Sequence, residues 1–184
     1  MYPKPALLLL ICFMSLECFC IPSFCASGNN DFPKDFSAGL VSSPKGVGLC
    51  MDLWYDGETF TSLSFTSDLI DILNGESSTP GGKSTIHYNF IFDRFKDGRI
   101  DLYAGPGLAA GYVRNTTDNK YGIMAGVSCD AGLRIKCLHS IVLSFELQAD
   151  FALIFKNRRN PDMALYKAGF LNSYYPHVRI QYAF

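Results

Sequence analysis

Hydrophobic and polar residues alternate over residues 140–155, SIVLSFELQADFALIF. Every odd-numbered position from 141 to 155 is apolar, and the even-numbered positions include Glu146, Gln148 and Asp150. Side chains on a β-strand point alternately to opposite faces, whereas the period of 3.6 of a helix would scatter them, so this pattern predicts a strand. A membrane-spanning strand needs only about 9–11 residues, and this segment is long enough. The central question is whether its apolar face points into a barrel or outward into lipid.

Seven further segments show the same alternation and are separated by turn-forming residues. We expect strands at residues 35–42, 47–55, 59–73, 85–92, 99–113, 121–136 and 174–184. Residues 75–83 and 156–173 are predicted loops, and residues 163–170 suit a helical turn within the second loop. Eight strands in hairpin order predict an all-β, up-and-down antiparallel barrel.

The polar face of these strands carries small and charged residues in mid-strand, among them Gly105, Gly107, Gly126 and Gly132. The interior of an eight-stranded barrel is narrow and filled by side chains, so small residues and paired charges fit inside while Phe and Leu fit outside. Aromatic residues gather at strand ends on the apolar face, where lipid-facing barrels carry girdles. These residues are Tyr55, Tyr112, Phe155, Tyr174, Tyr182 and Phe184. We therefore predict an eight-stranded transmembrane β-barrel, because the alternative, a soluble lipocalin-like carrier, needs the apolar face inside.

The lengths of the connections favour the same fold. The turns at residues 56–58, 93–98 and 137–139 are short, and most of the connections between them are longer. Outer-membrane barrels have short periplasmic turns and longer external loops. The short turn at residues 43–46 departs from this rule.

The first 27 residues have the features of a cleaved secretory signal peptide. Lys4 supplies the basic region, residues 6–14 form an apolar run, and Cys25, Ala26 and Ser27 place small residues at a cleavage site. The expected organisation is a signal peptide at residues 1–27, a periplasmic leader at residues 28–34 and a β-barrel at residues 35–184.

Charge and cysteine content limit the partners. The formal net charge of −1 gives no reason to expect nucleic acid. Four of the seven cysteines lie in the expected signal peptide, and Cys50, Cys129 and Cys137 remain. Their spacing does not suit a metal, so we interpret them as free thiols and expect neither a metal nor a cofactor.

The final strand, with Val178, Ile180, Tyr182 and Phe184, resembles the C-terminal signature of bacterial outer-membrane β-barrels. In that family an aromatic last residue helps the outer-membrane assembly machinery to recognise the chain. Residues 101–107, 110–112 and 122–126 resemble small barrel domains of the OmpX/OmpA type, especially those of Bacteroides-like bacteria. The resemblance implies a monomer in the outer membrane, in contact with membrane lipid and lipopolysaccharide. It implies fold and location more than activity, and names no external ligand.

Candidate catalytic residues are scattered. His87 and His177 fall on polar strand faces, and His139 falls in a turn. A grouping of Ser, His and an acid would resemble lipid-modifying outer-membrane enzymes, but no Gly-x-Ser-x-Gly or comparable motif supports it. We therefore expect no catalytic residues and predict a non-enzymatic barrel with a structural or surface-interaction role. A lipid-modifying enzyme is the alternative.

Register suggests an interior charge network centred on Asp101, Arg134, Glu146 and Arg179. Matching the inward faces on either side of residues 114–120 places Asp101 opposite Arg134. Pairing residue 136 with residue 140 would place Asp130 opposite Glu146, and Arg179 on the last strand would separate these two acids. A guanidinium can bridge carboxylates through several donors at once.

Overall fold

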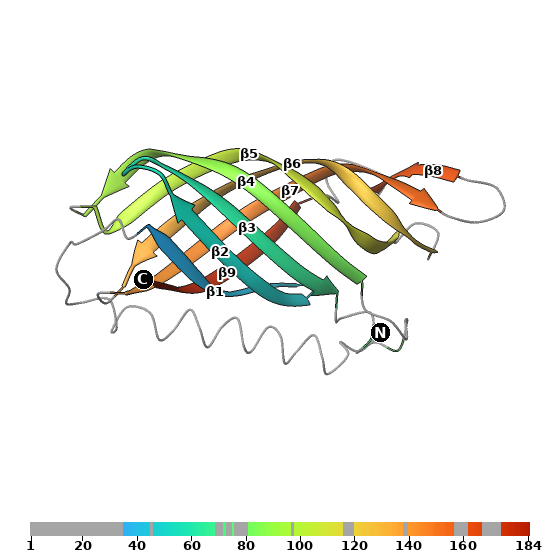
Figure 1. Cartoon of the computed structure of the whole chain (residues 1–184), viewed down its shortest axis with the longest axis horizontal. Helices are drawn as coiled ribbons and strands as arrows, with labels where there is room; N and C mark the ends of the chain where they lie inside the picture. Colours follow the sequence, from blue (N-terminus) through green and yellow to red (C-terminus); the bar gives the residue numbers. More distant parts are fainter. Residues whose placement is uncertain are drawn as a thin grey trace, which may run out of the picture.

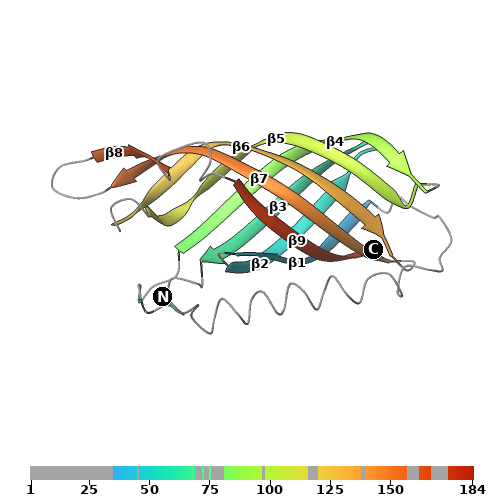
Figure 2. The same ribbon diagram turned by 180° about the vertical axis from the view of Figure 1, so that it is seen from behind.

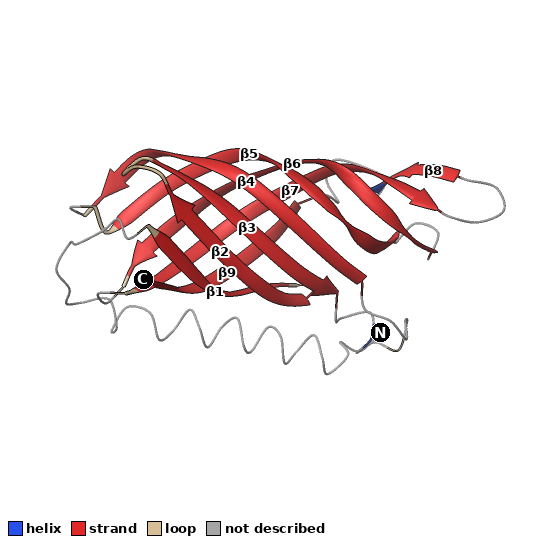
Figure 3. Cartoon of the chain, in the orientation of Figure 1, coloured by secondary structure: helices blue, strands red, loops and turns tan. Residues whose placement is uncertain are grey.

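Nine β-strands make up the described part of a computed structural model, which is drawn in Figure 1 and coloured by secondary structure in Figure 3. The structure describes residues 35–44, 46–68, 72, 75, 81–96, 98–115, 120–137, 140–156, 162–166 and 174–184. The strands are β1 (Phe36–Ser43), β2 (Gly46–Trp54), β3 (Thr59–Asp68), β4 (Gly81–Phe95), β5 (Ile100–Asn115), β6 (Lys120–Lys136), β7 (Ile141–Lys156), β8 (Asp162–Leu165) and β9 (Tyr174–Ala183). The expected signal peptide and leader lie outside the described residues. Among those residues, no helix has the length and apolar character needed to cross a membrane.

Eight of the strands close into an antiparallel barrel. Strands β1 to β7 pair in chain order, and β9 closes the ring by pairing with β1 on one side and β7 on the other. The ninth strand, β8, pairs with the end of β7 and lies beyond the barrel at the end opposite the C-terminus (Figures 1 and 2). The predicted fold, an eight-stranded up-and-down barrel, is confirmed.

The stagger of the strands fixes the width of the barrel. A path that follows paired residues from strand to strand leaves β6 at Ile135 and returns to it at Ala125, ten residues away. The residues on this path are Ile135, Leu143, Ile180, Leu40, Leu49, Phe65, Ser84, Ala110 and Ala125. Eight strands with such a shear tilt against the barrel axis and enclose an interior just wide enough for side chains.

Apolar side chains cover the outside of the barrel, and most of the side chains inside it are polar. An apolar cluster is also buried, formed by Ala109, Val113, Met124, Ala152, Ile154 and Tyr166. On β7, Asp150 is fully buried, whereas the neighbouring Phe151 is 40% exposed. The same inversion holds around the ring, where large exposed residues include Leu40, Leu49, Phe65, Ile86, Phe90, Leu108, Val127, Leu147 and Ile180. Soluble barrels have the opposite arrangement, so the alternative of a soluble carrier with an apolar interior is wrong about the facing of the strands.

Asp56 organises the tight turn between β2 and β3. Its Oδ1 accepts hydrogen bonds from the backbone N–H groups of Glu58 (2.8 Å) and Thr59 (2.5 Å) and from the Thr59 hydroxyl (2.9 Å). These donors, with that of Glu58 the most important, hold the pKa of Asp56 below its ordinary value. A side chain of this type replaces backbone pairing where the chain reverses.

Two expected boundaries were wrong near the β3–β4 loop. The strand expected to end at residue 73 ends at Asp68. Strand β4, expected to begin at residue 85, begins at Gly81, inside the segment 75–83 that was predicted to be a loop. The ladder between Asp68 and Gly81 continues through two glycines because backbone pairing does not require a side chain. At its other end β4 continues to Phe95, since a bulge between Ile91 and Asp93 shifts the register without ending the ladder.

The helical turn expected at residues 163–170 was also wrong over the residues that can be described. Residues Asp162–Leu165 form β8, with Met163 opposite Phe155. Pairing between β7 and β9 stops at Ala149 and Tyr174, which leaves one edge of the end of β7 open. Backbone groups on an open edge need partners, and β8 supplies them for Leu153–Lys156. Residues 167–170 lie outside the described part.

Candidate functional site

A buried ion network lies at the centre of the barrel. Arg179 on β9 places Nε 2.8 Å from Glu146 Oε2 and Nη1 3.3 Å from Asp52 Oδ1, and it also donates to the Ser62 hydroxyl. Arg134 on β6 lies 2.6 Å from the other oxygen of Asp52. The side chains of these two arginines and two acids are at most 1% exposed. Two positive and two negative charges therefore compensate one another in a place that solvent does not reach.

Three aromatic rings surround the Arg134 guanidinium. Its Cζ lies 4.4 Å from the ring centre of Trp54, 3.9 Å from that of Phe60 and 5.2 Å from that of Tyr103. Cations over aromatic faces are attracted by the ring quadrupole, and the attraction is strongest when both are desolvated. The cage holds Arg134 in place beside Asp52.

The structure agrees with one part of the expected register and contradicts another. Asp101 is opposite Arg134 on the neighbouring strand, as expected. Asp130 is opposite Gln148, so its expected pairing with Glu146 was wrong by two residues. The cause is the β6–β7 connection, where Lys136 pairs with residue 142 instead of residue 140.

Side-chain contacts of Asp101 also differ from the expected network. Its carboxylate lies 3.1 Å from Lys136 Nζ and 3.4 Å from Arg94 Nε, while Arg134 extends to Asp52. Asp101 therefore belongs to a separate cluster near the C-terminal end of the barrel. Asp52, Trp54 and Phe60 were not predicted as members of the network, because they lie on strands far from β6 in sequence.

A second polar network lies further along the barrel. Lys83 on β4 forms an ion pair of 2.7 Å with Asp150 on β7. The other oxygen of Asp150 accepts hydrogen bonds of 2.7 Å from the Ser128 hydroxyl and of 2.7 Å from Gln148 Nε2. His87 Nε2 lies 2.9 Å from Ser128 Oγ, and its Nδ1 lies 3.6 Å from Asp130 Oδ2. This network joins β4, β6 and β7 across the interior.

Glycines give the large polar side chains room to cross a strand. His87 lies over Gly107 to reach Ser128, Asn89 lies over Gly105 to reach Asp130, and Tyr103 lies over Gly132 to reach Glu146. In each case a Cβ on the glycine would clash with the crossing side chain. Gly105, Gly107 and Gly132 therefore allow polar groups two strands apart to meet. Gly126 instead lies against Ala152 and the backbone of Phe151.

This leads to a prediction for Gly132→Ala. The added methyl group would lie 2.7 Å from both Cζ and Oη of Tyr103 and 2.8 Å from the Phe145 carbonyl oxygen, so the ring has to leave the position in which it reaches Glu146. Overpacking of this kind costs about 1–3 kcal/mol, and we expect that loss in the free energy of unfolding measured by guanidinium titration. Gly57→Ala is the control, because the nearest atoms to its Cβ would be 3.9 Å away. Equal stability of the two variants would contradict the proposed crossing of Tyr103.

Ser128, His87 and Asp130 lie in the order found in hydrolase triads, a grouping that the sequence did not predict. Each is at most 4% exposed and faces the interior. The Ser128 hydroxyl donates to Asp150, so its hydrogen is directed away from His87. The three side chains are therefore part of the hydrogen-bonded network inside the barrel. Among the described residues, no group of three His, Cys, Asp or Glu side chains is placed to hold a metal ion.

The residues of the expected assembly signal share one face of the last strand. Ile180, Tyr182 and Phe184 are 43%, 52% and 65% exposed, whereas Val178 is buried. The Phe184 ring lies 5.1 Å from that of Tyr182 and 5.6 Å from that of Phe36. Recognition of these residues by an assembly machinery stays a prediction.

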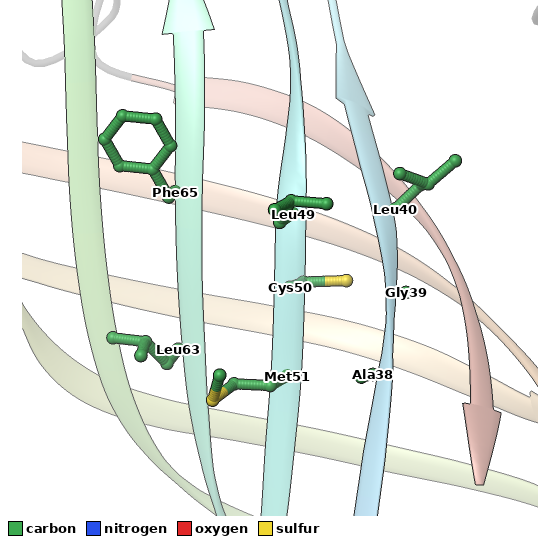
Figure 4. Close-up of a pocket in the computed structure, with 8 residues that line it drawn as sticks. All are labelled: Ala38, Gly39, Leu40, Leu49, Cys50, Met51, Leu63 and Phe65. Carbon is green, nitrogen blue, oxygen red and sulfur yellow. The ribbon is translucent and has the colours of Figure 1, made fainter.

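A shallow apolar groove crosses the outer face over β1, β2 and β3 (Figure 4). Its lining consists of Ala38, Gly39, Leu40, Leu49, Cys50, Met51, Leu63 and Phe65. Small residues on β1 lie beside the larger side chains of β2 and β3, which leaves the surface hollowed there. The exposed side chains of Leu40, Leu49 and Phe65 make the groove part of the apolar outer surface.

Comparison with solved structures gives one match that covers most of the chain. The N-terminal β-barrel domain of Pseudomonas aeruginosa OprF aligns with a TM-score of 0.53 over 82% of this chain and 98% of that one. The two proteins share a fold. Their sequences are 11% identical, so the likeness to OprF concerns the fold alone. No protein-family model matches the sequence, and no curated protein matches it either.

Proposed function

We propose that this protein is a small, non-enzymatic β-barrel of a bacterial outer membrane, with a structural or surface-interaction role. The observation that carries the proposal is the inversion of polarity, in which exposed apolar residues surround a buried ionic interior. Only lipid makes such an outer face favourable. The signal-like N-terminus, the terminal Phe184 and the OprF-like fold support the same location.

The interior is, in this proposal, a plug made of the protein's own side chains. The central network and the Lys83–Asp150 pair cross the barrel, and their side chains are almost wholly buried. The expected surroundings are membrane lipid and lipopolysaccharide on the outside and the assembly machinery during insertion. The loops at the end opposite the C-terminus would then face the cell's surroundings, as part of an OmpX/OmpA-type monomer.

Fractionation of a Gram-negative host that expresses the full chain tests the location. We expect the protein in the outer-membrane fraction, released only by detergent, because its apolar outer face cannot remain in water. A truncated N-terminus should be found at the expected cleavage region by mass spectrometry. Recovery as a soluble periplasmic protein without detergent would overturn the proposal.

The lipid-modifying alternative draws on the Ser128–His87–Asp130 geometry and has its own test. A fluorophosphonate probe should leave the detergent-solubilised protein unlabelled, because Ser128 is 4% exposed and faces away from lipid. Lipid A from cells expressing the wild type and Ser128→Ala should have the same mass profile. Labelling of Ser128, or a lipid A change that needs its hydroxyl, would establish an enzyme instead.

A further inference from the structure

Asp130 differs from the other buried acids in its partners. Among the acids described in the barrel interior, four lie within ion-pair distance of a lysine or arginine: Asp52, Asp101, Glu146 and Asp150. The ion pair of Asp130 is with His87, at 3.6 Å, and its Oδ2 also accepts a long hydrogen bond of 3.4 Å from Asn89 Nδ2. Its Oδ1 is buried without a hydrogen-bond partner. A buried carboxylate with no compensating charge is strongly unfavourable.

The positions of the hydrogens on His87 follow from its neighbour Ser128. The single hydroxyl hydrogen of Ser128 points to Asp150 Oδ1 at 2.7 Å or to the Ala149 carbonyl oxygen at 3.2 Å, and both groups only accept. The 2.9 Å hydrogen bond between His87 and Ser128 therefore needs a hydrogen on His87 Nε2. A neutral imidazole carries one hydrogen, so its Nδ1 would then present a lone pair. That nitrogen faces the Asp130 carboxylate and has no hydrogen-bond partner.

We infer that the His87–Asp130 pair binds one proton as part of the native barrel. In one form His87 is an imidazolium that pairs with the Asp130 carboxylate, and in the other Asp130 is a neutral acid. Either form converts two facing acceptors into a donor and an acceptor and removes the uncompensated charge. When the proton leaves for water, the pair is left with one negative charge. The inference rests on the interior geometry and does not depend on the proposed location.

Other charged groups around the pair are already matched with one another. Lys83, Asp150 and Arg179 act electrostatically on His87, and Glu146, Arg179 and Asp52 act on Asp130. Lys83 is paired with Asp150, and Arg179 is shared by Asp52 and Glu146. Among the described residues, the other titratable neighbours include Tyr103, which donates to Glu146, and His177, which interacts with His87 and Lys83. Cys129, next to Asp130 in sequence, is exposed on the outer face. These pairings leave the proton as the charge that compensates Asp130.

The dependence of unfolding on pH tests the inference in detergent micelles with the full chain. Free Asp and His side chains release their protons near pH 3.9 and about 6.5, so above about pH 7 the folded pair would hold one proton more than the unfolded chain. Stability must then fall as pH rises, and the unfolding constant should increase up to about tenfold per pH unit until the pair itself titrates. Asp130→Asn keeps the shape and removes the carboxylate, so this part of the slope should vanish. His177→Gln is the matched control and should keep the wild-type slope.

Spectroscopy on the wild type makes the test independent of whether Asp130→Asn folds. Histidines labelled with ¹⁵N identify His87 by the signal lost in His87→Gln, and ¹³C-labelled aspartate reports the carboxyl groups by infrared spectroscopy. At pH 7.5 we expect either both His87 nitrogens protonated or one protonated aspartic acid. A neutral His87 together with fully ionised aspartates would overturn the inference, as would a pH slope that Asp130→Asn leaves unchanged.

Discussion

Arg179→Ala is expected to lower the free energy of unfolding by about 3–5 kcal/mol, because it removes the partner of two buried carboxylates. Asp52 would keep Arg134 at 2.6 Å, but Glu146 would keep only the hydrogen bond from Tyr103. Glu146 would then be an uncompensated charge in the interior. Guanidinium unfolding of the protein refolded into phospholipid vesicles measures the loss.

A second substitution separates lost charge compensation from lost packing. Glu146→Gln in the Arg179→Ala background removes the uncompensated charge while keeping an oxygen that accepts from Tyr103, so part of the stability should return. The double-mutant cycle should therefore show a favourable coupling between the two positions. Simple additivity of the two changes would contradict the ion pair of 2.8 Å between them.

Arg94→Ala is the matched control for loss of an arginine. The Arg94 side chain is 39% exposed, and its partner Asp101 keeps Lys136 at 3.1 Å. A partly exposed pair of this kind contributes less than about 1 kcal/mol. A similar loss of unfolding free energy for Arg94→Ala and Arg179→Ala would show that burial does not account for the contribution of the central network to stability.

The sequence was sufficient to predict the eight barrel strands and their facing, because both depend on local alternation. It did not predict β8, which forms where β7 extends beyond its pairing with β9. On β7 the odd positions are apolar and many of the even positions are polar, so one set must face inward and the other outward. Which set faces inward follows from the width of the barrel, because a narrow interior has little room for large apolar side chains. The glycines at residues 105, 107 and 132 supplied that second piece of information, since they fit a crowded interior.

Contacts across the barrel could not be predicted in the same way. A ladder relates a residue to its neighbours on adjacent strands, as it does for Asp101 and Arg134. Asp52 and Arg134 meet across the interior, 82 positions apart in sequence, because the shear brings them to similar heights. The shear is the sum of the registers of all the strand pairs, so an error in one register affects every contact across the barrel. At the β6–β7 turn the expected register was wrong by two residues, and Asp130 was therefore expected opposite Glu146 when it is opposite Gln148.

Val127→Arg tests the other half of the architecture, the lipid-facing surface. Val127 lies near the middle of β6, is 57% exposed and has Leu108 and Phe151 as its outward neighbours. An arginine on the lipid face near the bilayer midplane costs about 2–4 kcal/mol, and we expect that loss for the protein unfolded from phospholipid vesicles. The cost arises because the guanidinium has neither water nor a carboxylate within reach.

Ile123→Arg on the same strand provides the comparison that isolates depth in the membrane. Ile123 is similarly exposed, at 59%, but it is paired with Tyr112 and lies two residues from Tyr121, whose rings stack on each other and would form part of an aromatic girdle at the interface. The expected cost there is only about 0–1 kcal/mol, since the long side chain can reach water. A barrel surrounded by water would tolerate both arginines equally, so equal stabilities in vesicles would show that this face does not contact lipid.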